Sequence, residues 1–191
     1  MNIGNEIFGK GFGFGALSGP TYGPYTIAFN TAVIANGGTL TTAEKTYLTT
    51  FETSMGADMA EFDRLWIHGL SNQIAAKVSF VNPTSTLITD VNSPTWTASQ
   101  GYTGNGSTSY LNSNYTPSID ANKYTLNSAS YGMYQRIELG STYYSGSMGA
   151  YSFAVSNFSY LLPSFGSLFY FDVNNITFDN YLSSTSSKGF Y

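Results

Sequence analysis

The feature of this sequence that most constrains the fold is a change in the spacing of its apolar residues near residue 93. From about Thr95 onward, large apolar and polar residues alternate with a period of two, most regularly over 131–139, 151–156 and 168–173. Such alternation is typical of β-strands with one buried face. Turn sequences separate the runs: Gly104-Asn105-Gly106, Gly140-Ser141, Asn174-Asn175 and Lys188-Gly189. Residues 93–191 are therefore expected to form an antiparallel β-sandwich of the jelly-roll type, completed by this chain, by a longer native chain or by a neighbouring chain.

Residues 25–92 carry the spacing of helices instead, so the expected fold class is mainly β with a helical N-terminal part. One apolar stripe consists of Ile27, Ala28, Ala32 and Ala35. Because Asn36-Gly37-Gly38 is a strong stop signal, a first helix is predicted over residues 25–35. We expect the whole region to act as a helical adaptor.

A second helix is predicted to begin at a capping box, in which Thr41 is the N-cap and Glu44 stands three residues later. Its apolar stripe is Leu48, Phe51, Met55 and Met59. The link between the two helices is short and contains glycine, which favours an antiparallel pair. Further along, Ser71 is expected to cap a short helix that ends before Asn82-Pro83.

Residues 1–24 are rich in glycine with aromatic residues between the glycines. This segment is not expected to be helical, because each glycine costs about 1 kcal/mol in a helix. We expect an extended anchoring arm, in which glycine lets the backbone lie flat on a partner while apolar side chains dock. The docking residues are Ile7, Phe8, Phe12, Phe14 and Leu17. The alternative is that the arm folds back over its own domain.

The composition narrows the function classes. Charged residues make up 9% of the chain, against about 25% in typical domains, whereas it contains 16 Tyr and 14 Phe. A net charge of −4 with only 7 scattered Lys and Arg argues against a nucleic-acid partner. No apolar run is long enough to span a membrane, and no signal peptide is recognisable. With 0 Cys, disulfides, thiolate metal sites and cysteine nucleophiles are excluded.

Few residues could carry catalysis. His68 is the single histidine, so a Ser-His-Asp triad would need it together with Asp63; no nucleophile motif accompanies it, and a structural histidine is expected. Paired carboxylates for glycoside hydrolysis could come only from Asp120, Glu138, Asp172 and Asp179 in the β-rich part. Asp172 and Asp179 flank Asn174-Asn175 and are expected to form a turn, although with Asn174 they could bind calcium. We expect no catalytic residue, no metal and no cofactor.

Tyrosines are the side chains best suited to binding. A tyrosine presents a rigid face and a hydroxyl at low entropic cost. Tyr110, Tyr143 and Tyr144 lie near predicted turns, where they could contact either a glycan or another subunit.

Two stretches carry a resemblance to a known class. Asn92-Ser93-Pro94-Thr95-Trp96-Thr97, followed by 101–111, resembles the opening strands of concanavalin A-like (laminin-G-like) domains in phage structural proteins. Upstream, 36–40, the capped helix and 62–67 complete a layout similar to virion appendage proteins of tailed phages, including crAss-like phages of Bacteroidetes hosts. The resemblance covers about residues 25–191.

The resemblance implies a non-enzymatic structural protein located in the virion, as a tail or head fibre or appendage. Its expected partners are other virion proteins of the tail, portal or capsid, together with further copies of itself, with a trimer as the expected oligomer. The alternatives are a carbohydrate-binding module for host surface glycans and a capsule depolymerase, which the scarcity of suitable acids disfavours.

Overall fold

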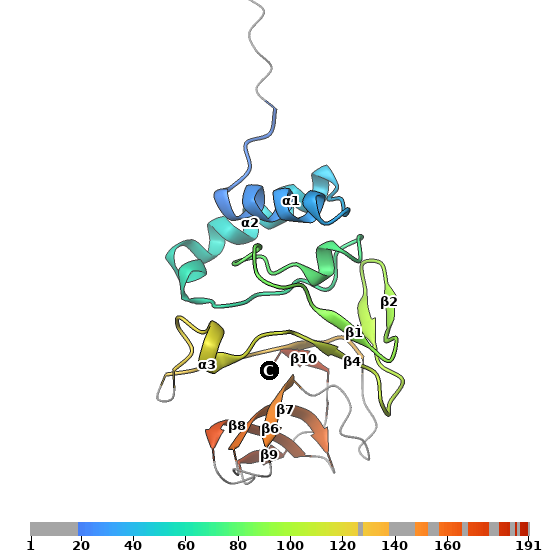
Figure 1. Cartoon of the computed structure of the whole chain (residues 1–191), viewed down its shortest axis with the longest axis vertical. Coiled ribbons are helices and arrows are strands. Elements are labelled where there is room, and N and C mark those ends of the chain that lie inside the picture. The colour runs from blue at the N-terminus through green and yellow to red at the C-terminus, as the bar shows by residue number, and fades with distance from the viewer. Residues whose placement is uncertain are drawn as a thin grey trace, which may run out of the picture.

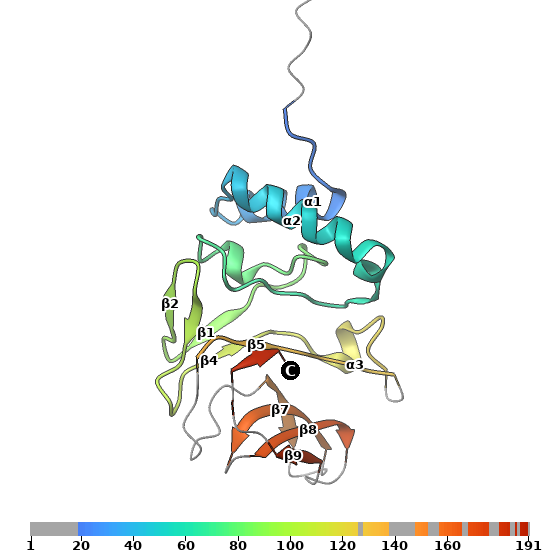
Figure 2. The ribbon, with the colours of Figure 1, turned by 180° about the vertical axis from the view of Figure 1, so that it is seen from behind.

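The computed structural model describes residues 19–125, 128–137, 148–152, 157–165, 168–175, 180–183, 186 and 188–190. Within these ranges, helices lie on the N-terminal side and antiparallel strands follow, so the mixed helix and strand class is confirmed. A pair of helices occupies one end of the molecule and a four-stranded sheet the other, with two-stranded ribbons and irregular segments between them (Figures 1 and 2).

The helices of the described part are α1 (Pro24–Ala35), α2 (Thr42–Met55) and α3 (Pro117–Asp120), with 3-10 turns η1 (Gly56–Glu61) and η2 (Ala75–Lys77). Helices α1 and α2 match the two predicted helices. Pro24 stands in the first turn of α1, where its missing N–H group removes no hydrogen bond.

A buried carboxylate joins the two long helices. Glu52, near the end of α2, is 7% exposed and accepts hydrogen bonds from the backbone N–H groups of Tyr25 (3.1 Å) and Thr26 (3.0 Å) and from the Thr26 hydroxyl (3.0 Å). These N–H groups have no partner within α1, and the start of a helix favours negative charge. A Cβ at Gly23 would lie 2.4 Å from this carboxylate, so glycine allows the close approach. Since the end of α2 meets the start of α1, the predicted antiparallel pair is confirmed.

The core face of α1 differs from the row of Ile27, Ala28, Ala32 and Ala35 that indicated the helix in the sequence; of this row, Ala32 packs against the core. The core face consists of Thr26, Phe29 and Val33, each 0% exposed, whereas Ile27 is 54% exposed. Thr26 can be buried because Glu52 satisfies both its N–H and its hydroxyl. Ala28 and Ala35 are exposed, whereas Ala32 is partly buried against the core.

Helix α2 begins as predicted. The Thr41 hydroxyl accepts from Glu44 N–H (3.1 Å), and Glu44 Oε2 accepts from Thr41 N–H (2.8 Å), so the capping box is confirmed. Glu44 Oε1 also accepts from Ser71 N–H (2.6 Å). Burial raises the pKa of Glu44, but these hydrogen bonds outweigh it and leave the pKa below its ordinary value.

The expected helix capped by Ser71 is instead the single 3-10 turn η2. The side chain of Asn72 caps it, because its Oδ1 accepts from Ala75 N–H (3.1 Å), while Ser71 points its N–H toward Glu44. A hydrophobic core fills the space between the helices and this turn: Phe29, Val33, Leu48, Met59, Leu70, Ala75, Val78 and Phe80. Phe80 lies at its centre, with its ring 5.3 Å from the ring of Phe29 in edge contact.

The strands are short. They are β1 (Thr89–Val91), β2 (Thr95–Thr97), β3 (Gly101–Thr103), β4 (Tyr110–Asn112), β5 (Tyr134–Gln135), β6 (Met148–Ser152), β7 (Asn157–Phe165), β8 (Leu168–Asn175), β9 (Tyr181–Ser183) and β10 (Gly189–Phe190). Antiparallel pairing gives one sheet in the order β6-β7-β8-β9 and three ribbons, β1-β4, β2-β3 and β5-β10. The described strands do not by themselves confirm a two-layer jelly roll.

The strands predicted from alternating apolar and polar residues are present in part. The run 168–173 lies within β8, whereas the run 131–139 yields only the two residues of β5 within the described part. Residues 153–156, 138 and 139 lie outside the described ranges. The turn predicted at Asn174-Asn175 was wrong, because both residues still belong to β8.

The turn at Gly104-Asn105-Gly106 is confirmed. Asn105 Oδ1 accepts from the N–H groups of Ser107, Thr108 and Ser109 at 2.9–3.0 Å, and Gly106 has φ +76°, which favours glycine. Gly140-Ser141 lies outside the described residues, and Gly189 opens β10.

Replacing Glu52 should destabilise the helix pair. Glu52→Ala leaves two N–H groups and a buried hydroxyl of α1 without their acceptor, so we expect the free energy of unfolding to fall by about 1–3 kcal/mol. Urea denaturation followed by circular dichroism measures the change. Glu61→Ala is the control, since the Glu61 side chain is 70% exposed and its ion pair with Lys123 (3.6 Å) should contribute under about 1 kcal/mol. Equal losses in the two variants would contradict this assignment.

Candidate functional site

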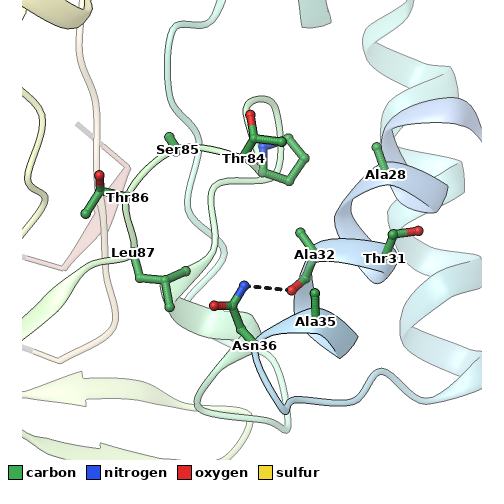
Figure 3. Close-up of a pocket in the computed structure, with 10 residues that line it drawn as sticks. Ala28, Thr31, Ala32, Ala35, Asn36, Thr84, Ser85, Thr86 and Leu87 are labelled. Atoms are coloured by element: carbon green, nitrogen blue, oxygen red, sulfur yellow. Dashed lines mark hydrogen bonds between the residues drawn. The ribbon is translucent and has the colours of Figure 1, made fainter.

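A groove lies between the outer face of α1 and the loop 83–87 (Figure 3). Its volume is about 730 Å³, within the usual range for binding pockets. The lining residues are Ala28, Thr31, Ala32, Ala35, Asn36, Pro83, Thr84, Ser85, Thr86 and Leu87. None of these side chains is charged, so the groove suits an apolar or hydroxyl-rich partner that carries no charge.

Local hydrogen bonds fix both walls of the groove. On the loop side, Asn82 accepts from the N–H (3.1 Å) and hydroxyl (2.6 Å) of Ser85 through its carbonyl, and from the Thr84 hydroxyl (3.1 Å) through its side chain. On the helix side, Asn36 Nδ2 donates to the carbonyl of Ala32 at 2.8 Å, as Figure 3 shows. The groove is thus preformed, which lowers the entropic cost of binding.

The apolar surface continues beyond the groove on the same helix. Ile27 is 54% and Ile34 58% exposed, although both are large aliphatic residues that usually lie inside. On α2, Tyr47 is 75% exposed. Exposed apolar residues beside a preformed groove are typical of an interaction surface.

Most of the binding residues predicted from sequence lie outside the described ranges, namely Ile7, Phe8, Phe12, Phe14, Leu17, Tyr143 and Tyr144. Tyr110 is described: it begins β4, pairs with Val91 of β1 and is 56% exposed. Its ring is exposed, and its contact with a glycan or another subunit stays a prediction.

His68 and Asp63 do not form a catalytic pair. His68 Nδ1 lies 2.9 Å from the carbonyl of Ala76, which can only accept, so this nitrogen carries the proton. The ring meets Tyr102 edge-on, with 5.5 Å between ring centroids. Burial lowers the pKa of His68 despite that hydrogen bond, so the ring is neutral near pH 7. These contacts fit the structural role expected for this histidine.

Asp63 instead ties the helical part to a loop about 60 residues later. Its carboxylate accepts from the N–H groups of Asn122 (2.9 Å), Lys123 (3.0 Å) and Tyr124 (2.8 Å) and from the Tyr115 hydroxyl (3.1 Å). Burial raises the pKa of Asp63, but these donors outweigh it and hold the pKa below its ordinary value. Next to it, the Arg64 guanidinium lies 5.0 Å from the centre of the Tyr115 ring.

The acids of the β-rich part also serve as hydrogen-bond acceptors. Asp172 is a buried residue of β8, 1% exposed, so the turn role predicted for it was wrong. Its carboxylate accepts from the Tyr160 hydroxyl (2.6 Å) and from Asn180 Nδ2 (2.6 Å). Asp120 accepts from Thr116 N–H (2.7 Å). Glu138 and Asp179 lie outside the described ranges, as does the side chain of Asn174.

The described residues were compared with the requirements of a metal site and of a membrane-spanning helix. No group of three or more His, Cys, Asp or Glu residues there could hold a metal ion. Among the described helices, none combines the length and apolar character needed to cross a bilayer.

Sequence reasoning missed the groove, although a signal was present. Ala28, Ala32 and Ala35 share helical spacing in the sequence, and two of them, Ala28 and Ala35, are exposed in the structure. The loop wall depends on Asn82 and Pro83, whose distance from α1 in space no sequence spacing gives.

Comparison with models of protein families, with curated protein sequences and with solved structures finds no match to this chain. The resemblance of 92–97 and 101–111 to phage concanavalin A-like domains therefore stays a prediction. In the structure these segments form β2, β3 and β4, so the strands expected there are present.

The hydrogen bonds to the Asp63 carboxylate should make the free energy of unfolding depend on pH. Its lowered pKa means that the ionised carboxylate stabilises the fold above about pH 4, and that this contribution is lost as the pH falls through the folded-state pKa. We expect Asp63→Asn to lower the free energy of unfolding at pH 7 by about 1–2 kcal/mol, a range kept small by solvent screening. Urea titrations from pH 7 to pH 2 should show this difference shrinking.

The matched control is Asp58→Asn, which replaces an exposed acid of η1. It should change stability by less than about 0.5 kcal/mol at every pH. A constant gap between wild type and Asp63→Asn down to pH 2 would contradict the role given to the carboxylate.

Proposed function

We propose that this chain is a structural component of a bacteriophage particle, a fibre or appendage protein that anchors through its N-terminal arm and assembles with other virion proteins. The observation that carries the proposal is the uncharged, preformed groove along α1, bordered by the exposed Ile27 and Ile34. An assembly protein requires such a surface for protein neighbours. The resemblance of the sequence to virion appendage proteins supplies the phage setting.

The exposed apolar residues support an assembly role. Those described with large exposed side chains are Ile27, Ile34, Tyr47, Phe51, Phe62, Tyr110, Ile119, Tyr134, Ile137, Val173, Tyr181 and Leu182. Burying apolar surface between subunits contributes roughly 25 cal/mol per Å². Because only 9% of the residues are charged, few charges would have to lose their hydration when such contacts form.

The proposal includes the finer fold expected from the sequence. In it, the sheet β6-β7-β8-β9 is one layer of a concanavalin A-like sandwich. The particle-bound protein is a homo-oligomer, with a trimer as the proposed state, and it works by contact alone without catalysis.

Glycan recognition is the second candidate function, favoured by Tyr110. This tyrosine is 56% exposed and stands at the start of a β-ribbon rather than in the core. Exposed tyrosines bind well through their faces and hydroxyls. In this proposal, the β-rich part recognises host surface sugars after the arm has anchored the protein.

Deleting the arm should separate folding from assembly. A chain without residues 1–18 keeps Gly23, whose N–H donates to Thr49 Oγ1 (3.2 Å), and it keeps the whole described fold. We expect an unchanged circular dichroism spectrum and no incorporation into particles, measured by immunoblot of purified virions from a complemented deletion phage. A chain carrying Phe12→Ser and Phe14→Ser controls for arm length and should also fail to incorporate. Normal incorporation of both variants would refute the anchoring role.

A glycan array tests the second function. If the β-rich part recognises sugars, the purified protein should bind selected glycans with a Kd of roughly micromolar order. Tyr110→Ala, Tyr143→Ala or Tyr144→Ala should then weaken binding, while Tyr47→Ala on α2 should leave it unchanged. Silence across an array of host surface glycans would count against recognition and leave the scaffold role standing.

A further inference from the structure

We propose that the groove along α1 receives the arm of a second copy of this chain, with Phe12 and Phe14 as the inserted side chains. This inference rests on the proposed function, because it names the first partner of the arm. The occupant is identified by its chemistry, by its spacing and by the way the chain enters α1.

Charge is the first criterion. The ten residues that line the groove carry none, so a charged occupant would lose hydration there without compensation. Within the arm, Glu6 and Lys10 are the charged side chains, and both precede the stretch Gly11-Phe12-Gly13-Phe14-Gly15. This stretch is therefore the part of the arm that the groove can accept.

Spacing is the second criterion. In an extended segment, residues two apart point to the same side and lie about 6.6 Å from each other. Phe12 and Phe14 would thus face the groove together. Along α1, the lining from Ala28 to Ala35 extends for about 10 Å, which gives room for two rings side by side. Small alanine side chains on one surface and glycines between the phenylalanines allow a close approach of the two backbones.

The third criterion is the path of the chain into α1. Just before the helix, the Tyr22 ring lies under Lys45 Nζ of α2 (5.1 Å to the ring centre), and Gly23 N–H donates to Thr49 of α2 (3.2 Å). The chain therefore enters α1 beside α2, whereas the groove lies between α1 and the loop 83–87, which forms its opposite wall (Figure 3). Residues 19–23 lead away from the helix pair (Figures 1 and 2), so an arm that reached the groove of its own chain would have to turn back over α1. An arm from a second copy has no such constraint.

Such an exchange joins copies head to tail. The donor surface and the acceptor surface are different, so each copy gives one arm and receives one. Head-to-tail contacts form a closed ring when the rotation from one copy to the next divides a full turn evenly. This would produce the homo-oligomer of the proposed function without any other interface.

Cysteine cross-linking tests the docking directly, because the chain has no cysteine of its own. Full-length Phe12→Cys is mixed with full-length Ala35→Cys under mild oxidation. Ala35 is an exposed residue of the groove, and a disulfide requires Cα atoms within about 7 Å. We expect a disulfide-linked heterodimer on non-reducing gels. Phe12→Cys mixed with Ala57→Cys, an exposed alanine of η1 outside the groove, should give only background.

The double variant, with Phe12→Cys and Ala35→Cys in one chain, separates a second copy from self-docking. Linked oligomers are expected. A monomer with an internal disulfide would overturn the second copy, and the absence of any disulfide in either format would overturn the groove as the arm's site. These assays use purified protein without particles. The cross-linking can therefore fail while virion incorporation succeeds, and it can succeed while incorporation fails.

Association of the full chain gives an independent readout. Sedimentation of the wild-type chain over a concentration series should show oligomers. In Ala28→Arg, the dissociation constant of these oligomers should rise by at least about tenfold, because the substitution places a positive charge in the uncharged groove. Ala57→Arg should leave association unchanged. A wild-type chain that stays monomeric at all concentrations, or equal effects of the two substitutions, would overturn the proposal.

Discussion

The carboxylate of Glu52 at the start of α1 determines how the rest of the helical part is arranged. By satisfying the first N–H groups of α1 and the hydroxyl of Thr26, it allows a polar residue to lie in the core and sets which face of the helix turns inward. Phe29 and Val33 follow Thr26 into the core, while Ala28 and Ala35 stay exposed and form, with Ala32, one wall of the groove. The candidate docking surface is thus a consequence of one buried acid.

The same use of acids recurs through the described part of the chain. Glu44 accepts from Ser71, Asp63 from the loop 122–124, and Asp172 from Tyr160 and Asn180. Lys77 and Asp90 form an ion pair at 2.6 Å. Each contact joins segments at least 8 residues apart, and hydrogen bonds to charged groups are stronger than neutral ones. These acids hold the fold together from within, and the groove is left to apolar and hydroxyl groups.

Sequence reasoning succeeded where the deciding interactions are local. The capping box of Thr41 and Glu44, the end of α1 and the Asn105 turn depend on residues within four positions of each other. The stripe predicted for the second helix ran on to Met59, whereas α2 ends at Met55. Sequence reasoning failed where a distant partner decides. The inward face of α1 depends on Glu52, 26 residues away from Thr26, and the groove depends on a loop about 50 residues beyond the helix. Asp172, read as a turn residue, is held inside β8 by Tyr160 on the neighbouring strand.

The contacts of Asp63 have a mechanical consequence. A force on the arm would enter the folded part near Gly23 and pass through the helix pair, and Asp63 is one of the contacts that would carry it onward, beside the Lys77–Asp90 ion pair. Four donors from three consecutive backbone positions and a tyrosine converge on the Asp63 carboxylate. Bonds that share a load in parallel yield together rather than one by one. The four hydrogen bonds of Asp63 should therefore resist shear as a unit.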